Sequence, residues 1–294
     1  MKNKVLITGG QGFTGFYVSQ ALVEAGFDVF NLALVARGPK DVVGDLLNKD
    51  SLCAAVRQVQ PDYLIHLAAI AHVDHSNEAD FYAVNVAGTL NLLAAIRQEK
   101  NDILKIVLAS SANIYGNPTV EVVHEGVPAA PLNHYAMSKL AMEMLARTQF
   151  AEDLPLVFTR PFNYTGVGQA SSFLIPKIVT HFKQKKSFIE LGNTDVVREF
   201  NDVRTVAQAY CDILKHAPAG STVNICSGKG YALLDVIKMC EELMGFSIDV
   251  QINPKFVRQN ELKTLIGSPD LLLKIAPGLR FIPLNETLAW MLKE

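Results

Sequence analysis

Thr8-Gly9-Gly10-Gln11-Gly12-Phe13-Thr14-Gly15 is the stretch of this sequence that decides the fold. It follows an apolar run of strand length and opens a segment of helical periodicity, the context in which a Gly-x-Gly-x-x-Gly pattern indicates a dinucleotide site. Glycines let the backbone turn tightly and approach a pyrophosphate, which free N–H groups at the helix N-terminus then hold. The alternative is a tight strand-helix turn without a ligand. The residues expected to contact the coenzyme here are Gly9, Gly12, Phe13, Thr14 and Gly15.

Outward from this loop, apolar runs of strand length alternate with longer segments of helical period. This alternation predicts an α/β fold with a doubly wound parallel sheet, the Rossmann arrangement. The predicted strands are Val5–Thr8, Val29–Leu32, Asp41–Val43, Tyr63–Leu67, Ile106–Ala109 and Leu156–Phe162. The predicted long helices are Phe13–Ala25, Asp80–Gln98 and His134–Thr148.

After Asn163 the pattern changes to shorter pieces. We expect helices near 173–183, 203–215 and 233–244, and strands at 188–191 and 222–226. The sequence therefore predicts a smaller C-terminal substrate-binding lobe interleaved with the sheet domain. The sheet domain would comprise residues 1–164 and about 200–227, and the lobe about 165–199 and 228–294.

Composition excludes several classes of protein. Hydrophobic residues make up 49% and charged residues 19% of 294 residues, so the chain buries enough apolar surface to fold. A net charge of -2 gives no field that attracts nucleic acid or an anionic membrane. The apolar run before Gly9 is too short for a signal peptide, and no later stretch approaches ~20 uninterrupted apolar residues. These features predict a soluble cytoplasmic protein without nucleic-acid or membrane partners.

The four cysteines, Cys53, Cys211, Cys226 and Cys240, lie far apart in apolar segments without Cys-x-x-Cys spacing. This pattern predicts buried reduced thiols and no structural zinc.

The choice of coenzyme depends on the end of the second strand, where an acidic residue usually holds the ribose diol of NAD. No Asp or Glu occurs from Val29 through Lys40, and Arg37 is the nearest cation that could pair with a 2'-phosphate. This favours NADP over NAD. The alternative is that Arg37 is an ordinary surface arginine and NAD binds without a carboxylate. Asp45 could contact the adenine or cap the following turn.

Tyr135 and Lys139 stand four residues apart at the start of a predicted helix, so both project from one face. A nearby ammonium would lower the pKa of the phenol and make it useful in acid-base chemistry. Ser110 and Ser111 follow the predicted central strand, where ligands gather in a parallel sheet. Either hydroxyl could hydrogen-bond a substrate oxygen or could satisfy a turn at the strand end.

At this point the sequence resembles the extended short-chain dehydrogenases/reductases that act on nucleotide sugars. The motifs that carry the resemblance are Thr8–Gly15, His66–Ala69, Asn85–Thr89, Ser110–Gly116 and Tyr135–Lys139. The resemblance implies that Ser111 is catalytic, Tyr135 is the general acid-base, and Lys139 tunes Tyr135 and holds the nicotinamide ribose. It also implies coenzyme contacts from Leu46, Leu67, Ala68, Ala69 and Pro161, and a homodimer that pairs helices 80–98 and 135–148.

Residues beside Ser111 narrow the chemistry that the resemblance allows. Dehydration needs an acid and a base, which Ala112 and Asn113 do not supply. The missing acid after the second strand favours an exchangeable NADPH, hence a reductase over a 4-epimerase with retained NAD. A non-catalytic dinucleotide-sensing regulator is the alternative from another class.

Later stretches look like those of bacterial GDP-4-keto-6-deoxy-mannose reductases, which make GDP-6-deoxyhexoses such as GDP-rhamnose. They are 159–163, 166–169, 198–204 and 258–261. By this resemblance the sugar nucleotide would be held by Asn163, Gln169, Arg198, Arg258 and Glu261. Arginine forks suit a diphosphate. Alternatively, Arg198 is a surface charge on a strand, and Arg258 with Glu261 forms an ion pair within a helix.

The segment His72-Val73-Asp74-His75 has residue types that bind metals. It follows a strand end, where it would line the coenzyme cleft, and hydride transfer to a ketone in this family needs no metal. We therefore expect no metal site.

Overall fold

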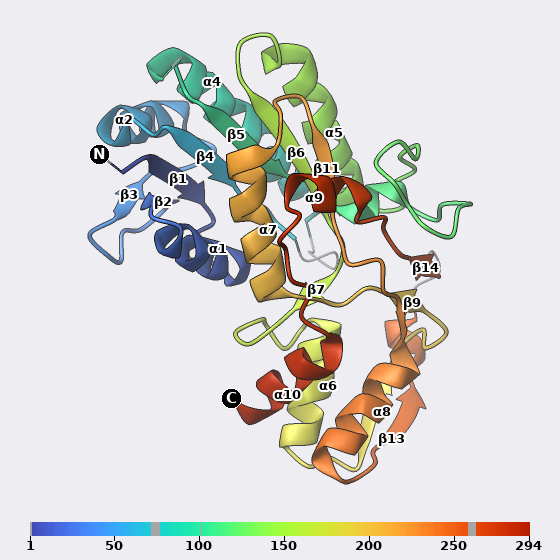
Figure 1. The fold of residues 1–294 in the computed structure, drawn as a ribbon. Helices are drawn as coiled ribbons and strands as arrows, with labels where there is room; N and C mark the ends of the chain where they lie inside the picture. The colour runs from blue at the N-terminus through green and yellow to red at the C-terminus, as the bar shows by residue number, and fades with distance from the viewer. Residues whose placement is uncertain (1, 72–76, 101, 258–262) are drawn as a thin grey trace.

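The computed structural model describes residues 2–71, 77–100, 102–257 and 263–294 (Figure 1). Its centre is a sheet of seven parallel strands in the order β11-β6-β5-β4-β1-β2-β3. The strands are β1 (Lys4–Thr8), β2 (Asp28–Ala33), β3 (Asp41–Val43), β4 (Tyr63–His66), β5 (Lys105–Ala109), β6 (Leu156–Pro161) and β11 (Thr222–Ile225). The predicted doubly wound α/β fold is confirmed, and each predicted strand of the sheet lies within about one residue of its expected position.

Helices cover both faces of this sheet. They are α1 (Phe13–Glu24), α2 (Lys49–Val59), α4 (Thr89–Glu99), α5 (His134–Phe150), α7 (Val203–His216) and α9 (Asp270–Ile275). Alternate residues of each strand point to opposite faces. On β1, Leu6 packs in a core with α2, α4 and α5. Val5 and Ile7 pack on the other face, with α1, α7 and α9. Burial on both faces explains the unbroken apolar runs in the sequence.

The chain order creates a crevice at one edge of the sheet. From β1 the chain runs outward through β2 and β3, then returns to β4 on the other side of β1. At such a switch point the loops after the two central strands separate and leave room for a ligand. Thr8 ends β1 and His66 ends β4, and the two are paired in register. The crevice therefore lies between the glycine loop and residues 67–70.

The predicted helix 80–98 is divided in the structure. It comprises α3 (Glu78–Tyr82), a π-helical turn η1 (Ala83–Gly88) and α4. The run Glu78–Glu99 is long and apolar enough to cross a membrane by length and composition. Half of that stretch is buried, and it packs against α2 and α5. It therefore has the packing of a core helix.

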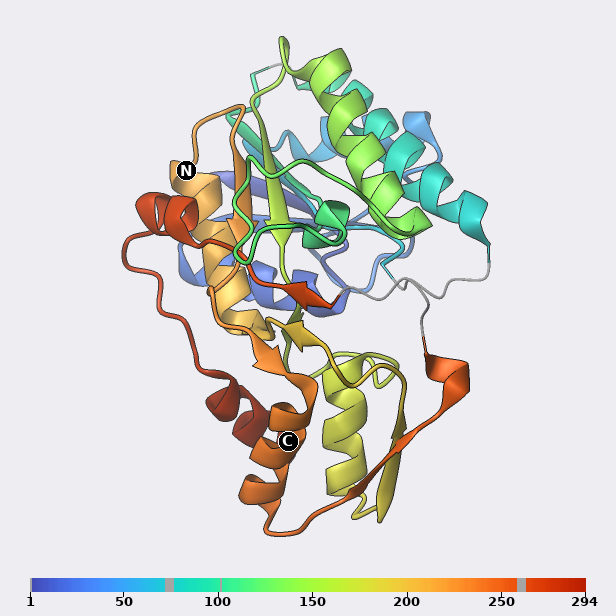
Figure 2. The same cartoon turned by 90° about the vertical axis from the view of Figure 1, so that its right-hand side faces the viewer.

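A second lobe lies below the sheet domain in Figures 1 and 2. Its core joins α6 (Leu174–Lys183), α8 (Leu233–Met244) and α10 (Leu284–Lys293) with β8 (Phe188–Leu191) and β13 (Asp249–Ile252). Short strands connect it to the sheet domain: β7 (Tyr164–Thr165) pairs with β10 (Asn201–Asp202), and β9 (Val197–Arg198) lies between β12 (Tyr231–Ala232) and β14 (Thr264–Leu265). Within the range predicted for the lobe, α9 packs on the sheet core instead.

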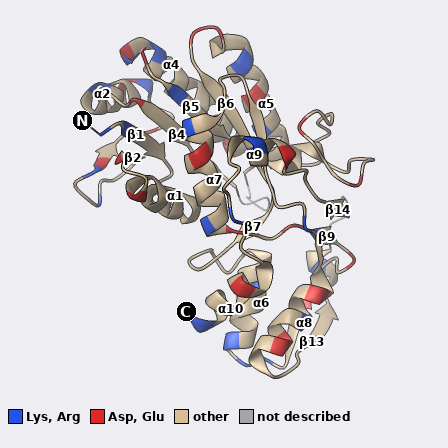
Figure 3. Cartoon of the chain, in the orientation of Figure 1, with Lys and Arg blue, Asp and Glu red and all other residues tan. Residues whose placement is uncertain are grey.

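Two further features bear on the sequence predictions. All four cysteines are buried and free, as expected. Charges of both signs are interspersed over the two lobes in Figure 3, in keeping with the net charge of -2.

Candidate active site

The glycine loop is held in its turn by close packing. Gly9 has a φ of +73°, and a Cβ there would lie 2.8 Å from the Ala68 nitrogen. A Cβ on Gly15 would overlap the Gly9 carbonyl oxygen. A Cβ on Gly12 would meet only that oxygen, at 3.2 Å. Gly9 and Gly15 therefore permit the packing of strand, helix and neighbouring loop, whereas Gly12 leaves the exposed side of the loop open to a ligand.

The start of α1 suits an anion. Gly12 is the N-cap residue, no side chain caps the helix, and its first turn contains no acidic residue. The first N–H groups of a helix need partners, and here phosphate oxygens can supply them. Gly12, Phe13 and Thr14 therefore fit the pyrophosphate of a dinucleotide.

Ser110 gives a second sign of a missing ligand. Its side chain is 3% exposed, and its Oγ is the buried polar side-chain atom, among the described residues, without a hydrogen-bond partner. A buried hydroxyl without a partner is costly. Because Ser110 directly follows β5 at the carboxyl edge of the sheet, a ligand in the crevice could supply that partner.

At the far end of the glycine loop, the structure supplies a carboxylate that we did not expect. Asp41, the first residue of β3, pairs in register with Asn31 of β2. Its carboxylate accepts from Gln11 Nε2 at 3.0 Å, from Asn31 Nδ2 at 3.2 Å, and from the backbone nitrogens of Arg37 and Gly38 at 2.7 and 2.9 Å. Burial opposes ionisation, but these bonds together hold the pKa of Asp41 below its ordinary value.

Asp41 thus fixes the loop that carries Arg37, whose side chain is exposed. Asp45 accepts from the Leu47 nitrogen at 2.9 Å, so it caps the turn after β3, one of its two expected roles. Leu46 packs partly buried against the sheet core, where its carbonyl accepts from Asn91 Nδ2 at 3.0 Å.

The loop after β4 is fixed by a buried polar chain. Thr89 Oγ1 donates to the Asn85 carbonyl at 2.8 Å, so it accepts from His66 Nε2, also at 2.8 Å. His66 Nδ1 then accepts from Thr8 Oγ1 at 2.6 Å. Burial and the nearby Lys139 charge lower the pKa of His66 to about 3, so the ring is neutral. The network therefore selects the tautomer with the proton on Nε2.

The same chain orients the wall of the crevice opposite the glycine loop. Thr8 Oγ1 accepts from the Ala68 nitrogen at 3.2 Å. The side-chain amide of Asn85 makes two hydrogen bonds to the backbone of Ile70. Its Oδ1 accepts from the Ile70 nitrogen at 2.9 Å, and its Nδ2 donates to the Ile70 carbonyl at 3.1 Å. Leu67, Ala68 and Ala69 are partly buried on this wall, in a position to contact a coenzyme.

The predicted catalytic side chains come together from two elements. Ser111 follows β5 and caps the short 3-10 helix η2 (Ala112–Tyr115), where its Oγ accepts from Asn113 N at 3.2 Å. Tyr135 lies in the first turn of α5, whose N-cap Asn133 accepts from Ala136 N at 2.8 Å. The Ser111 hydroxyl lies close enough to the Tyr135 phenol to act on its pKa. Residues distant in sequence thus meet at the carboxyl end of β5.

The acid-base properties of Tyr135 differ from our expectation. Burial raises its pKa to about 12, although the nearby Ser111 hydroxyl favours the ionised form. The other group that acts on it is Tyr164, which raises the pKa further. We expected Lys139 to lower this pKa; in the structure desolvation by burial dominates. At neutral pH Tyr135 is therefore a protonated acid.

Lys139 lies at the same strand end. The residue is 3% exposed, and its ammonium donates to the Ala109 carbonyl at 2.7 Å. Burial lowers its pKa to about 8, while the Glu143 carboxylate opposes this shift. Glu143 is one helical turn further along α5 and is itself buried. It accepts two bonds from the Arg160 guanidinium of β6, at 3.0 and 2.8 Å.

Asn163 and Gln169, which were predicted to hold the sugar nucleotide, lie in different environments in the structure. Asn163 is exposed and lies two residues after Pro161, the last residue of β6. Its carbonyl accepts from Asn201 N at 2.8 Å. The Gln169 amide donates to the Tyr164 carbonyl at 3.2 Å and accepts from Thr165 Oγ1 at 2.8 Å. Gln169 therefore braces its own loop, and its contact with a substrate stays a prediction.

Arg198 is 6% exposed at the end of β9, where it donates to the Val197 carbonyl at 3.0 Å. It is therefore not a charge on a strand surface. Its neighbour Glu199 is buried and accepts from the nitrogens of Ser227 and Gly267, both at 2.7 Å. This carboxylate, which the sequence reasoning missed as a structural residue, ties three segments of the lobe together. Arg258 and Glu261 lie outside the described residues.

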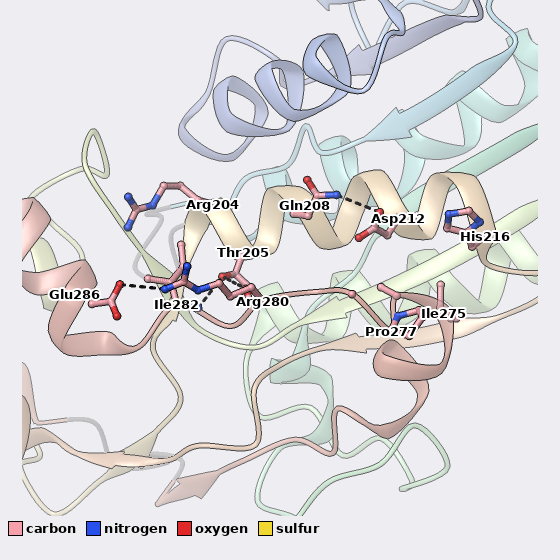
Figure 4. A pocket seen from close by; sticks show the side chains of 12 residues that line it. Arg204, Thr205, Gln208, Asp212, His216, Ile275, Pro277, Arg280, Ile282 and Glu286 are labelled. Atoms are coloured by element: carbon pink, nitrogen blue, oxygen red, sulfur yellow. Dashed lines mark hydrogen bonds and ion pairs between the residues drawn. The ribbon is translucent and has the colours of Figure 1, made fainter.

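A surface groove of about 680 Å³ lies elsewhere, between α7 and residues 275–286 (Figure 4). Its charged side chains are paired: Arg280 with Glu286 at 3.9 Å, and Arg204 with Asp202 at 2.7 Å. None of the predicted catalytic residues lines it. Because none of them lies there, we do not assign the chemistry to this groove.

Among the described residues, no group of three or more His, Cys, Asp or Glu side chains could hold a metal ion. The segment 72–75, which the sequence analysis considered for a metal, lies outside the described residues.

Comparison with known proteins places this geometry among enzymes. Residues 5–226 match the family described as "NAD dependent epimerase/dehydratase family". GDP-6-deoxy-D-talose 4-dehydrogenase of Aggregatibacter actinomycetemcomitans is 34% identical over 92% of this chain and 90% of its own length. GDP-6-deoxy-D-mannose reductase of Pseudomonas aeruginosa is 31% identical over 91% of this chain and 89% of its own length.

Solved structures share the whole fold. A Burkholderia cenocepacia protein that carries a provisional epimerase name is 44% identical, with a TM-score of 0.92 over 99% of this chain and 97% of that one. RMD from Pseudomonas aeruginosa, solved in complex with NADPH, is 29% identical, with a TM-score of 0.87 over 99% and 98%.

Proposed function

Because this chain belongs to the NAD dependent epimerase/dehydratase family, we propose that it reduces the C4 ketone of a nucleotide-activated 4-keto-6-deoxy sugar with NADPH. The coarser part of this function follows from the family itself: the chain is an NAD(P)-dependent oxidoreductase of the extended short-chain dehydrogenase/reductase type that modifies nucleotide sugars.

The position of Tyr135, a protonated phenol close to Ser111 at the strand ends, is the observation that carries the proposal. Reduction of a ketone needs a proton donor at the forming alkoxide, whereas oxidation of an alcohol needs a base. A phenol whose pKa is raised to about 12 holds its proton at neutral pH. It lies with Ser111 at the carboxyl end of the sheet, the edge at which the glycine loop follows β1. A protonated phenol at this edge suits the reduction of a ketone.

In this proposal each residue of the site has one role. The coenzyme, when bound, supplies the hydride. The Ser111 hydroxyl donates a hydrogen bond to the C4 carbonyl oxygen and stabilises the charge that develops there. Tyr135 transfers its phenolic proton to the same oxygen. Lys139, with its charge held at the end of β5, positions the nicotinamide ribose. Gly12 and Thr14 hold the pyrophosphate.

The names of the relatives support a GDP-linked 6-deoxyhexose as the sugar nucleotide. Both relatives are named for oxidation or reduction of such compounds. We propose GDP-4-keto-6-deoxy-mannose as the substrate, held by Asn163, Arg198, Arg258 and Glu261. The exposed Arg37 and the NADPH complex of the Pseudomonas aeruginosa structure support NADPH as the coenzyme.

A 4-epimerase with retained NAD is the second candidate function. Two observations favour it: the Asp41 carboxylate beside the glycine loop, and the epimerase name of the 44% identical structure. All four hydrogen bonds that Asp41 accepts come from the protein itself, so this carboxylate is already occupied in shaping the loop. For that reason we place the reductase first.

An exposed apolar face of α5 supports a homodimer. Met137, Met144 and Leu145 project from α5 with exposed fractions of 44%, 61% and 37%. Their spacing places them on one side of the helix. A stripe of exposed apolar side chains on one helix face indicates a protein interface. We propose that two copies pair through this face, and that the enzyme works in the cytoplasm.

The test is a substrate screen. The protein is incubated with NADPH and, separately, with the GDP-, dTDP-, UDP- and CDP-linked 4-keto-6-deoxy sugars. The loss of NADPH absorbance is followed, and NMR then identifies the product. The proposal expects stoichiometric oxidation of NADPH and a new C4 hydroxyl, fastest with the GDP sugar. Interconversion of 4-hydroxy epimers without net NADPH consumption would establish the epimerase instead.

A further inference from the structure

The segment after Asn163 is the place where the coenzyme loop touches the second lobe. Tyr164 begins β7, which pairs with β10 of the lobe connection. The Tyr164 hydroxyl and Thr14 Oγ1 lie 2.8 Å apart in a hydrogen bond. The rings of Tyr164 and Phe13 are stacked, with centroids 6.2 Å apart and planes 10° from parallel. Both contacts reach the first two residues of α1.

The position of Thr14 gives this bond its significance. Thr14 lies in the first turn of α1, whose uncapped N–H groups fit the pyrophosphate of the coenzyme. Any ligand that fixes this turn also fixes the Thr14 hydroxyl. The hydrogen bond then acts on Tyr164 and on the residues that follow it in the chain.

Hydrogen-bond counting indicates a further role for the pair. Thr14 and Tyr164 each carry one hydroxyl proton, and the bond between them uses one of the two. Among the described residues, neither hydroxyl makes a second hydrogen bond, so the second proton has no acceptor outside this pair. One donor therefore remains for a ligand oxygen at the junction of the two lobes.

Tyr164 also lies near the reaction centre. Its phenol is close enough to Tyr135 to raise the pKa of that residue. It is adjacent in sequence to Asn163, a proposed ligand of the sugar nucleotide. The same side chain therefore contacts the coenzyme loop and neighbours both the catalytic acid and the substrate segment.

We infer that the Thr14–Tyr164 hydroxyl pair couples coenzyme binding to the ordering of residues 164–169, which makes Tyr164 a positioning residue for the sugar nucleotide. This inference rests on the proposed function for the identity of the second ligand. The coupling itself needs only the coenzyme. Binding at the start of α1 stabilises the hydroxyl pair, and the pair in turn holds the segment in the conformation that receives the substrate.

Tyr17 provides a matched control. It lies one turn further along α1 and also bonds to the same segment, through its hydroxyl to the Val167 carbonyl at 2.7 Å. The phenylalanine variant removes one hydroxyl there as well, but away from the first turn that receives the pyrophosphate. A merely structural role would make Tyr17→Phe and Tyr164→Phe equivalent.

The experiment is hydrogen exchange of the backbone amides of residues 164–169 in the full-length protein, with and without saturating NADPH. Saturation is checked for each variant by the fluorescence of the bound coenzyme. In the wild type, NADPH should slow exchange in this segment. In Tyr164→Phe and in Thr14→Val, this slowing should shrink by roughly two- to tenfold, the effect of one hydrogen bond. Tyr17→Phe should raise exchange with and without NADPH but keep the difference between the two states.

Two results would overturn the inference. The first is an NADPH-dependent slowing in Tyr164→Phe as large as in the wild type. The second is an equal loss in Tyr17→Phe, which would assign the effect to the whole interface. The double variant Thr14→Val with Tyr164→Phe should behave like either single variant, because both remove one bond. Failure of the substrate screen would refute the proposed function and leave this result standing, since the exchange measurement uses no sugar.

Discussion

The Lys139 ammonium is buried and donates a hydrogen bond of 2.7 Å to the carbonyl oxygen of Ala109. This bond fixes a positive charge at the carboxyl end of β5. The charge stays there against the cost of desolvation, which lowers the pKa of Lys139 to about 8. A charge held at such a cost is typical of a functional site.

Lys139→Met should therefore lower the activity of the enzyme and raise the stability of the fold. The variant should lose most turnover because nothing then positions the nicotinamide ribose. Its free energy of unfolding at pH 7, measured by urea denaturation without coenzyme, should rise, by at most roughly 3 kcal/mol, because the buried charge is removed. A large loss of stability would contradict this account of the residue.

The difference in free energy of unfolding between Lys139→Met and the wild type should depend on pH. Between about pH 8 and the ordinary lysine pKa of 10.5, the unfolded chain keeps a proton that the folded protein has released. The free energy of unfolding of the wild type should therefore rise through this window. Lys139→Met lacks this gain, so its advantage should be largest below pH 8 and vanish near pH 10.5. An advantage that stays constant with pH would show that Lys139 is not a buried cation.

Glu143→Gln should destabilise the protein. Its carboxylate is 2% exposed and makes two bonds to Arg160, so the variant leaves the guanidinium buried without an anionic partner. The expected loss in the free energy of unfolding is about 3–5 kcal/mol. Arg57→Gln is the control, since Arg57 pairs with Glu99 at 2.9 Å but is largely exposed, and it should cause a far smaller loss. Equal losses in the two variants would contradict the assignment.

Arg37→Ala tests the choice of coenzyme. If Arg37 pairs with the 2'-phosphate, the KM for NADPH should rise roughly tenfold or more, while the KM for NADH stays nearly constant. The side chain is exposed and its backbone is held by Asp41, so the substitution leaves the loop in place. Steady-state rates with both coenzymes measure this. A wild-type preference for NADH would remove Arg37 from the site.

A substitution on the exposed apolar stripe of α5 tests the proposed dimer. Met144→Glu places a charge on the α5 stripe and should convert a dimer to a monomer in light scattering, because two copies of the charge would meet across the interface. Leu104→Glu is the control, since Leu104 is 55% exposed and lies outside α4 and α5. A wild-type protein that is already monomeric would refute this interface.

Local patterns carried most of what the sequence predicted. The glycine loop, the strands of the sheet and the Tyr135–Lys139 spacing are each contained in a few adjacent residues, and their physical causes act over the same distance. The position of Ser111 beside Tyr135 followed from the rule that strand ends meet at one edge of a parallel sheet. The helix α2 was missed, although Asn48 caps it by accepting from Ser51 N at 3.1 Å.

Features that depend on tertiary contacts were not predictable in the same way. An acidic residue is expected at the end of the second strand, but the carboxylate beside the glycine loop comes from Asp41 on the next strand. The spacing of Tyr135 and Lys139 suggested a lowered pKa for the phenol, but burial, which only the folded chain produces, raises that pKa. The Thr14–Tyr164 bond joins residues 150 positions apart in the chain, and no local pattern marks it.

The measurement that tests the central claim most directly compares the wild type with Tyr135→Phe, using NADPH and GDP-4-keto-6-deoxy-mannose. The account predicts that loss of the phenolic proton lowers turnover by about 10²–10⁴-fold while the Kd for NADPH stays the same. A Tyr135→Phe enzyme that oxidises NADPH at nearly the wild-type rate would contradict it.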